Sequence, residues 1–373
     1  MTDATATGTT ETPLSTAIEE YLTSVEAGNS AAIADSSLRE WANWLATERD
    51  ATTLEEVAVI DCRRYARHLK RRVRDDDLKA STANTYYAYV RAFLGFCEAD
   101  ELIDRNPAAV SRAQSELPED PGDADRQFWS ERDRKAILQF MDRRVERALD
   151  GEAAVGRERA YRDRALVRLL ALSGVRGAEV FRDPADDRRD GATWEDVDVE
   201  GGALRVFGKS REYEYAQLPE RAAEALERYR RVQEPPTPRF PVFPTDHAPS
   251  KYAAVRDQLG DRDYDEARIE EILDANPVDE VVREYEVIVP AISTRGARDL
   301  MKRLCEQADL DVDGEYLKPH GARRGLGHKL YSEGHAELAQ SALRHASIST
   351  THESYSDIRA SETAERVDDV LDE

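Results

Sequence analysis

The 373-residue sequence predicts a mainly α-helical protein with a small antiparallel β-sheet, divided into two units. Three observations predict this fold class. Apolar residues recur at helical spacing over most of the chain, alternation with a period of two is confined to the middle, and a polar, proline-containing stretch separates two helical regions. Each region is long enough to bury its own core. We therefore expect a helical N-terminal domain followed by an α+β domain.

Residues 15–110 are expected to form the N-terminal domain, behind a flexible N-terminus at residues 1–14. One apolar stripe has the helical spacing i, i+3, i+4, i+7, and it consists of Cys62, Tyr65, Ala66 and Leu69. A later stripe consists of Tyr86, Tyr89, Val90, Phe93 and Cys97. The dipeptide Asn106-Pro107 then ends the helical pattern and the unit.

Residues 111–126 lack periodicity and are expected to form a linker. The second domain, residues 127–360, opens with a helix that Ser130 can cap. Alternation then predicts three short strands in the segments TWEDVDV, ALRVFG and EYEYAQLP. Residues 235–289, proline-rich and then acidic, are expected to be a surface insertion. Helices resume after it, and residues 361–373 are expected to form an acidic C-terminal tail.

The charge composition predicts a halophilic, haloarchaeal source. The formal net charge is −23, and the chain has 45 arginines but only 8 lysines. At ~1 M salt the Debye length is about 3 Å, so this acidity does not exclude an anionic partner. An ordinary acidic protein that avoids polyanions remains the alternative.

Targeting and cysteine patterns point to a cytoplasmic protein without a membrane partner. No apolar run of membrane-spanning length occurs, and the N-terminus lacks the features of a signal peptide. The cysteines Cys62, Cys97 and Cys305 are far apart and lack metal-ligand spacing, so we interpret them as core residues.

One predicted helix of the N-terminal domain has a basic face opposite its apolar stripe. The face is formed by Arg63, Arg67, Lys70, Arg71 and Arg74. Such a face is suited to the phosphates of nucleic acid. A solvated arginine surface is the alternative interpretation.

Residues with chemical potential gather in the second domain. Arg176 stands beside glycines with Glu179 three residues later, and its guanidinium group can approach a phosphate closely. Lys209 occupies the tip of a predicted hairpin, where a flexible ammonium group can reach into a groove, although many hairpin lysines are merely solvated.

Two further motifs follow. His320 and Arg323 share one face of a helix that Pro319 can begin, and His345 precedes Tyr355 by ten residues. His345 and Tyr355 could equally be packed core residues. A metal site is another alternative, formed by His320, His328, His345 and His352. Neither an HExxH motif nor paired cysteines accompany these histidines.

Together and in this order, the motifs SGVRGAE, FGKSRE, HGAR and LRHASISTT and the following tyrosine resemble those of the tyrosine recombinase, or phage integrase, family, which includes the Xer-like site-specific recombinases. The resemblance implies a core-binding (SAM-like) N-terminal domain that ends at the NPA of residues 106–108. It also implies a set of catalytic residues, namely Arg176, Lys209, His320, Arg323, His345 and Tyr355. Glu179 is expected to support this set, and Arg324 to contact DNA.

The family's reaction is cleavage and rejoining of DNA strands through a covalent 3′-phosphotyrosine. Two guanidinium groups can neutralise the charge that develops on the phosphate, Lys209 can protonate the leaving oxygen, and the covalent bond conserves energy. The resemblance therefore implies no metal and no nucleotide cofactor. It implies double-stranded DNA as partner, and self-association into a tetrameric synapse.

The sequence departs from the family pattern at several points, which include Ala322 in place of leucine in the HGAR motif and the following glycines Gly325 and Gly327. Arg344 replaces the usual glycine before His345, the interval from His345 to Tyr355 is one residue longer than usual, and the loop DPADDRRDG lengthens the interval from Arg176 to Lys209. A type IB topoisomerase and a non-catalytic DNA-binding relative remain alternative functions.

Overall fold

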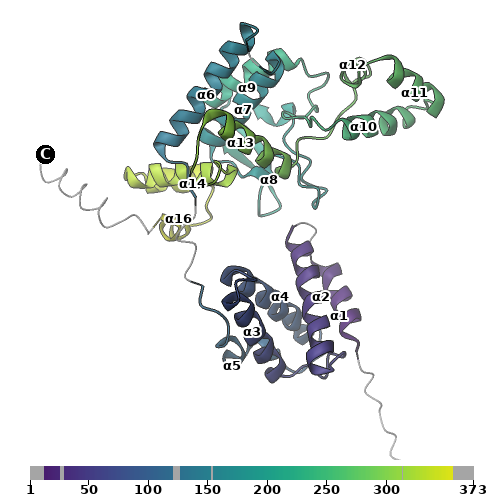
Figure 1. The fold of residues 1–373 in the computed structure, drawn as a ribbon, viewed down its shortest axis with the longest axis vertical. Helices are drawn as coiled ribbons and strands as arrows, with labels where there is room; N and C mark the ends of the chain where they lie inside the picture. Colours follow the sequence, from purple (N-terminus) through teal and green to yellow (C-terminus); the bar gives the residue numbers. More distant parts are fainter. Residues whose placement is uncertain (1–11, 26–28, 121–126, 153, 313, 356–373) are drawn as a thin grey trace, which may run out of the picture. The chain divides into compact units, whose positions relative to one another are not determined.

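The chain divides into two compact units, Met1–Asp125 and Arg126–Glu373 (Figure 1). The computed structural model describes residues 12–25, 29–120, 127–152, 154–312 and 314–355. Each unit has its own hydrophobic core, as the sequence predicted. No helix within these described ranges is long and apolar enough to cross a bilayer.

The first unit is built from helices around an aromatic core. Its elements are α1 (Leu14–Ser24), α2 (Asn29–Arg49), α3 (Val59–Arg74), α4 (Ala80–Ala99), the 3-10 turn η1 (Pro107–Ala109) and α5 (Ser111–Gln114). The stripe predicted between Cys62 and Leu69 is buried on α3. On α4, Val90, Phe93 and Cys97 are buried as predicted and Tyr86 packs against the core, but Tyr87 is buried in place of Tyr89. The Tyr87 hydroxyl donates a hydrogen bond to the Ala108 carbonyl (3.2 Å), which holds η1 on the core.

Both predicted borders of this unit need correction. Residues 12–14, assigned to a flexible N-terminus, pair with the chain before α3, since the Leu14 amide donates to the Thr52 carbonyl (3.0 Å). Residues 1–11 lie outside the described residues. The predicted linker at 111–126 instead begins with α5, and Leu117 packs against the core of the first unit. The predicted linker has too few apolar side chains at helical spacing to give a periodic pattern, so the sequence does not indicate this helix.

The second unit is mainly helical, with one small sheet. Its first elements are α6 (Glu131–Leu149), α7 (Arg157–Ser173), α8 (Gly177–Val180), the 3-10 turn η2 (Trp194–Asp196), β1 (Val197–Asp198), β2 (Ala203–Phe207), β3 (Tyr213–Gln217) and α9 (Glu220–Gln233). Ser130 caps α6 as predicted, because its hydroxyl accepts a hydrogen bond from the Asp133 amide (3.1 Å). Helix α7 is buried around most of its surface and packs against α6 and α9. The strands are antiparallel in the order β1-β2-β3, which confirms the predicted sheet.

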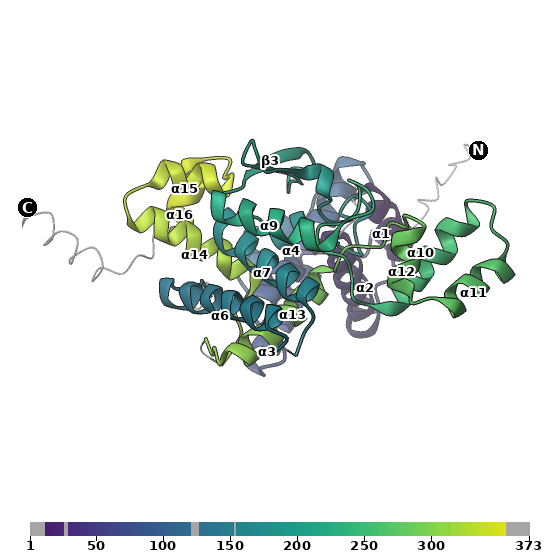
Figure 2. The same cartoon turned by 90° about the horizontal axis from the view of Figure 1, so that it is seen from above.

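The predicted surface insertion at 235–289 needs correction. Phe240, Val242 and Phe243 are buried in the core of the second unit, so this part is not a surface segment. The remainder forms α10 (Ala248–Gly260), α11 (Glu266–Ala275) and α12 (Val278–Glu284), which lie together at one side of the unit (Figures 1 and 2).

The last described elements are four helices. They are α13 (Thr294–Ala308), α14 (Pro319–Ser332), α15 (Ala336–Leu343) and α16 (Ile348–Tyr355). Pro319 is the first residue of α14, as expected from its fixed φ and its missing amide hydrogen. Helices α14, α15 and α16 pack together, and α14 also packs on α7 (Figure 2). The predicted domain end at residue 360 and the tail at 361–373 lie outside the described residues.

Candidate active site

The turn between α7 and α8 holds Arg176 against Glu179. Gly174 ends α7 with φ of +67°, and Arg176 then caps α8. The Arg176 amide donates to Glu179 Oε2 (2.7 Å), and its guanidinium Nη1 donates to Oε1 (2.7 Å). Burial alone would raise the pKa of Glu179, but the nearby Arg344 and these hydrogen bonds lower it. The buried carboxylate is therefore charged, and it fixes both the backbone and the side chain of Arg176.

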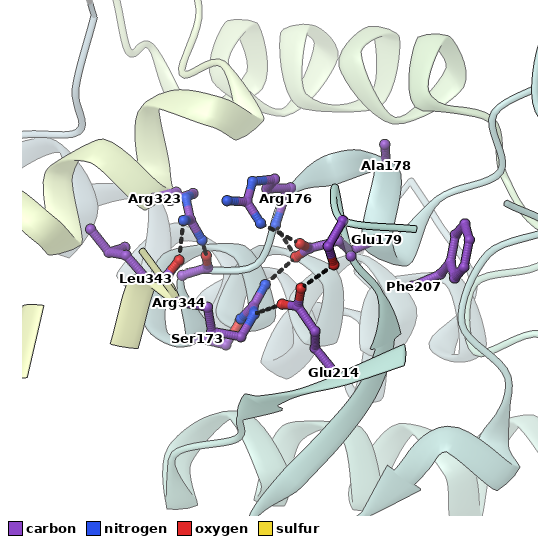
Figure 3. A network of polar contacts seen from close by, with 12 residues as sticks. Ser173, Arg176, Ala178, Glu179, Phe207, Glu214, Arg323, Leu343 and Arg344 are labelled. Carbon is purple, nitrogen blue, oxygen red and sulfur yellow. Dashed lines mark hydrogen bonds and ion pairs between the residues drawn. The ribbon is translucent and has the colours of Figure 1, made fainter. Parts of the chain in front are cut away.

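A second arginine, Arg344, reaches the same carboxylate from the end of α15. Its Nη2 lies 2.5 Å from Glu179 Oε2, and its Nε lies 3.2 Å from Glu214 Oε2 on β3. Figure 3 shows Arg176 and Arg344 converging on Glu179. Arg344 has φ of +50°, a left-handed conformation that favours glycine. In the sequence, Arg344 is notable only because it replaces the usual glycine before His345, and no pattern indicates Glu214 as part of the site.

Arg323 lies within the same cluster, inside α14. Its side chain is buried and donates to two carbonyl oxygens, those of Gly174 (2.5 Å) and Leu343 (Figure 3). Burial, followed by repulsion from Arg176, lowers the pKa of Arg323 to about 10. The cluster thus contains three guanidinium groups and two carboxylates, and the carboxylates of Glu179 and Glu214 are bound by Arg176 and Arg344. The cluster has excess positive charge and is suited to an anionic ligand.

Tyr355 lies against α14 at the end of α16. The residue is 8% exposed, and a Cβ atom built on Gly327 would lie 2.0 Å from the tyrosine hydroxyl. Burial raises the pKa of Tyr355, while the positive charges of Arg323 and Arg324 oppose that shift. The structure therefore brings Tyr355 into electrostatic contact with two of the predicted site residues.

His345 connects the arginine cluster to the tyrosine helix. Its Nδ1 lies 2.9 Å from the Thr351 hydroxyl, and Thr351 is fully buried on α16. Burial and the positive charges of Arg323 and Arg176 lower the pKa of His345. Despite the irregular spacing of its motif, His345 therefore lies within the field of both arginines.

Lys209 and His320 are exposed, in contrast to the arginines. Lys209 lies in the turn between β2 and β3, and it forms no ion pair with another described residue. His320 is the second residue of α14, one turn before Arg323. Among the predicted catalytic residues, electrostatic interactions bring together Arg176, Arg323, His345 and Tyr355.

The metal interpretation of the histidines has no support in the described part of the chain. His352 Nδ1 bonds to the Tyr331 hydroxyl (2.7 Å), and the His328 ring stacks on Phe128 with centroids 4.8 Å apart. Within the described residues, no three histidine, cysteine or acidic side chains are arranged to hold a metal ion.

The basic face of the first unit surrounds an open groove of about 670 Å³. The groove is lined by Trp44, Glu48, Arg49, Arg64, Arg67, Lys70, Arg71 and Arg74. Four of the five residues predicted for the face line it. The fifth, Arg63, donates to Glu116 Oε1 (2.6 Å), an oxygen that also accepts from Arg67 (2.8 Å). Two further arginines line the groove beyond those predicted, namely Arg64, whose helical spacing to Arg71 is visible in the sequence, and Arg49, which comes from another helix.

Known proteins similar to this chain belong to one family. Residues 131–362 match the model of the phage integrase family. Tyrosine recombinase XerC of Chlorobaculum tepidum is 29% identical over 193 residues, covering 50% of this chain and 51% of the relative. XerC of Pelobacter propionicus is 28% identical over 199 residues, covering 52% and 55%. The chain thus spans about half the length of these curated relatives.

Solved structures show a similar fold over nearly the whole chain. The Tn1549 transposon integrase in complex with transposon right end DNA has a TM-score of 0.59 at 14% identity, covering 96% of this chain and 99% of that one. The XerH recombinase bound to palindromic difH substrate has a TM-score of 0.58 at 14% identity, covering 96% and 95%. A lambda integrase dimer bound to a core site has a TM-score of 0.53 at 14% identity, covering 92% and 77%.

Proposed function

The chain belongs to the phage integrase family, and on that premise we propose that it is a site-specific DNA recombinase that acts through a covalent 3′-phosphotyrosine. The observation that carries the proposal is the buried cluster of Arg176, Arg323 and Arg344, with its excess positive charge, next to Tyr355. A phosphodiester would supply the negative charge that this cluster lacks.

In the proposed cleavage step, the Tyr355 hydroxyl oxygen attacks phosphorus and forms the O–P bond while the bond from phosphorus to the 5′-oxygen breaks. Negative charge develops on the non-bridging oxygens, where Arg176 and Arg323 stabilise it. Lys209 gives a proton to the leaving 5′-oxygen, which departs as a hydroxyl. The tyrosine proton passes to a base. Our candidate is His345, because its lowered pKa keeps the imidazole neutral near pH 7.

Rejoining reverses these events. The 5′-hydroxyl of another strand attacks the phosphotyrosine, loses its proton to Lys209, and releases Tyr355, which regains a proton. His320 is proposed to bond to the phosphate. Because the phosphotyrosine stores the energy of the broken bond, the two steps need no nucleotide triphosphate.

We propose double-stranded DNA as substrate, held by the groove of the first unit and by Arg324. We also propose that several copies of the chain associate on DNA into a tetrameric synapse, since exchange between two duplexes needs four strand cleavages. We propose a cytoplasmic location, because an archaeal source keeps its DNA in the cytoplasm.

A nicked suicide substrate, which traps the covalent intermediate, tests the proposal. The target sequence of this substrate is taken from DNA that is recovered bound to the protein in its host. At molar salt the wild type should form a protein–DNA adduct, and Tyr355→Phe should bind DNA without forming one. Tyr331→Phe is the matched control, because its ring centroid lies 5.9 Å from that of Tyr355.

Three outcomes separate the candidate functions. An undiminished adduct in Tyr355→Phe would place the nucleophile elsewhere. Binding without any wild-type adduct would indicate a non-catalytic relative. Relaxation of supercoiled DNA without exchange between two sites would indicate a topoisomerase.

A further inference from the structure

The loop that lengthens the interval from Arg176 to Lys209, residues 183–191, has a defined conformation. The Asp183 amide donates to the Arg189 carbonyl (2.8 Å), and the Arg189 amide donates to the Asp186 carbonyl (2.8 Å). Gly191 then takes φ of +91°, where a Cβ atom would lie 2.6 Å from that of Ala291. The loop therefore directs the Arg189 side chain inward, where it is only 13% exposed.

Arg189 joins the two segments that bear Arg176 and Lys209. Its Nη1 donates to the carbonyl oxygens of Ala178 (3.0 Å) and Phe207 (2.8 Å), and its Nη2 donates to that of Gly208 (2.7 Å). Ala178 lies in α8, two residues after Arg176. Gly208 directly precedes Lys209. Figure 3 shows Ala178 and Phe207 beside the arginine cluster.

Asp186 adds a second connection between the loop and the hairpin. Its Oδ2 lies 3.2 Å from Arg189 Nε and 2.9 Å from Nη1 of Arg211, which lies in the hairpin turn. Burial alone would raise the pKa of Asp186, but hydrogen bonds from Arg211 and from the Arg188 amide lower it. The Phe207 ring completes the packing, with the Arg188 guanidinium 4.3 Å and that of Arg189 5.1 Å from its centroid.

We infer that Arg189 is a positioning residue that sets Lys209 relative to Arg176, an inference that rests on the proposed function. A general acid must come within about 2.6–3.2 Å of the atom it protonates. The Lys209 ammonium is exposed and forms no ion pair with a described residue, so its reach is set by the backbone of the turn. Arg189 bonds to that backbone at the residue before Lys209 and bonds also to the Arg176 helix.

Arg189→Lys tests the inference, because lysine keeps the charge but lacks the planar fork that joins three carbonyl oxygens. Single-turnover cleavage is compared on ordinary DNA and on DNA whose bridging 5′-oxygen is replaced by sulfur. A thiolate leaves without a proton, since a thiol has a pKa of ~8.5. We expect Arg189→Lys to lose about 10²-fold on ordinary DNA, the cost of a ~1 Å displacement. On the sulfur substrate cleavage should be restored, as it should be for Lys209→Ala.

A double variant and a neighbouring arginine are the controls. Arg189→Lys combined with Lys209→Ala should cleave ordinary DNA no more slowly than Lys209→Ala alone, since both act on one proton transfer. Arg188→Ala should have a smaller effect than Arg189→Lys, because Arg188 packs on Phe207 and donates weakly to the Arg211 carbonyl (3.4 Å) but to none of the three carbonyl oxygens. If Arg189→Lys does not fold, Asp186→Asn should show a smaller loss with the same restoration by sulfur.

The outcomes distinguish this inference from the proposed function. Absence of wild-type adducts on both substrates would overturn both. With an active wild type, equal losses for Arg189→Lys on the two substrates would show a purely structural role and overturn the inference alone. Failure of sulfur to restore Lys209→Ala would also overturn it, because Arg189 could not then act through Lys209.

Discussion

Arg344 Nη2 lies 2.5 Å from Glu179 Oε2, so a residue that departs from the family pattern binds the carboxylate that holds Arg176. The backbone at Arg344 is left-handed, with φ of +50°, and glycine would adopt this conformation at lower cost. The ion pair therefore exists despite a backbone preference against arginine. Because Glu214 binds the same guanidinium, Arg344 also ties the β2–β3 hairpin to the cluster.

The first prediction concerns the stability provided by Arg344. In Arg344→Gly, loss of one partner of the buried Glu179 carboxylate should cost about 3 kcal/mol. Relief of the left-handed conformation should offset about 1 kcal/mol of this cost, for a net loss of about 2 kcal/mol in the free energy of unfolding. Denaturant unfolding at molar salt measures it. In the Arg344→Gly protein, the additional substitution Glu179→Gln should reduce the loss of stability. If Arg344→Gly is as stable as the wild type, the backbone strain at Arg344 cancels the energy of its ion pairs.

The second prediction concerns the fit of Tyr355 on α14. In Gly327→Ala the new Cβ atom would lie 2.4 Å from the Tyr355 ring carbon Cζ, so the tyrosine must move. We expect overpacking to lower the free energy of unfolding by about 1–3 kcal/mol. Because the tyrosine hydroxyl is displaced, the rate of adduct formation should fall on the order of tenfold or more. Gly260→Ala is the control, because no atom lies within 4 Å of its Cβ position. Normal adduct formation by Gly327→Ala would show that α16 accommodates the change.

The third prediction concerns the groove of the first unit. Arg64 and Arg71 line it without an ion pair to any residue in the described part of the chain, whereas Arg67 is bound to Glu116. If the groove binds phosphates, Arg64→Ala/Arg71→Ala should weaken DNA binding and reduce the slope of log affinity against log salt by about 2. Glu116→Gln should strengthen binding by releasing Arg67. Cleavage of bound substrate should persist in both variants.

Fluorescence anisotropy at several salt concentrations measures the binding. Arg39→Ala is the matched control, since Arg39 is an exposed arginine of α2 paired with Asp35. Unchanged affinity and slope in the double variant would show that the groove is only solvated.

The fourth prediction concerns salt itself, and it follows from the net charge of −23. Added salt normally weakens DNA binding through counterion release. Below roughly 0.1 M, however, unscreened repulsion within this acidic chain should loosen the fold. DNA affinity should therefore pass through a maximum as salt rises, with circular dichroism reporting the fold. A monotonic loss of affinity from low salt, with the fold intact, would contradict the halophilic interpretation.

The sequence by itself determined the local features of this protein. The stripe from Cys62 to Leu69 was predicted from helical spacing because each helix repeats its environment every three to four residues. The Arg176 and Arg323 motifs were recognisable because each lies within a few contiguous residues. The sheet followed from alternation and turn residues in one short segment.

Only the tertiary structure decided which distant residues share a site. Glu214 and Arg344 are 130 positions apart, yet their side chains meet because the end of α15 places a left-handed residue beside β3. Arg189 likewise finds its acceptors on two other segments, and those acceptors are backbone carbonyl oxygens, which no side-chain pattern encodes. Periodicity reports which face of an element is buried, but the partner of that face depends on chain reversals that residue spacing does not specify.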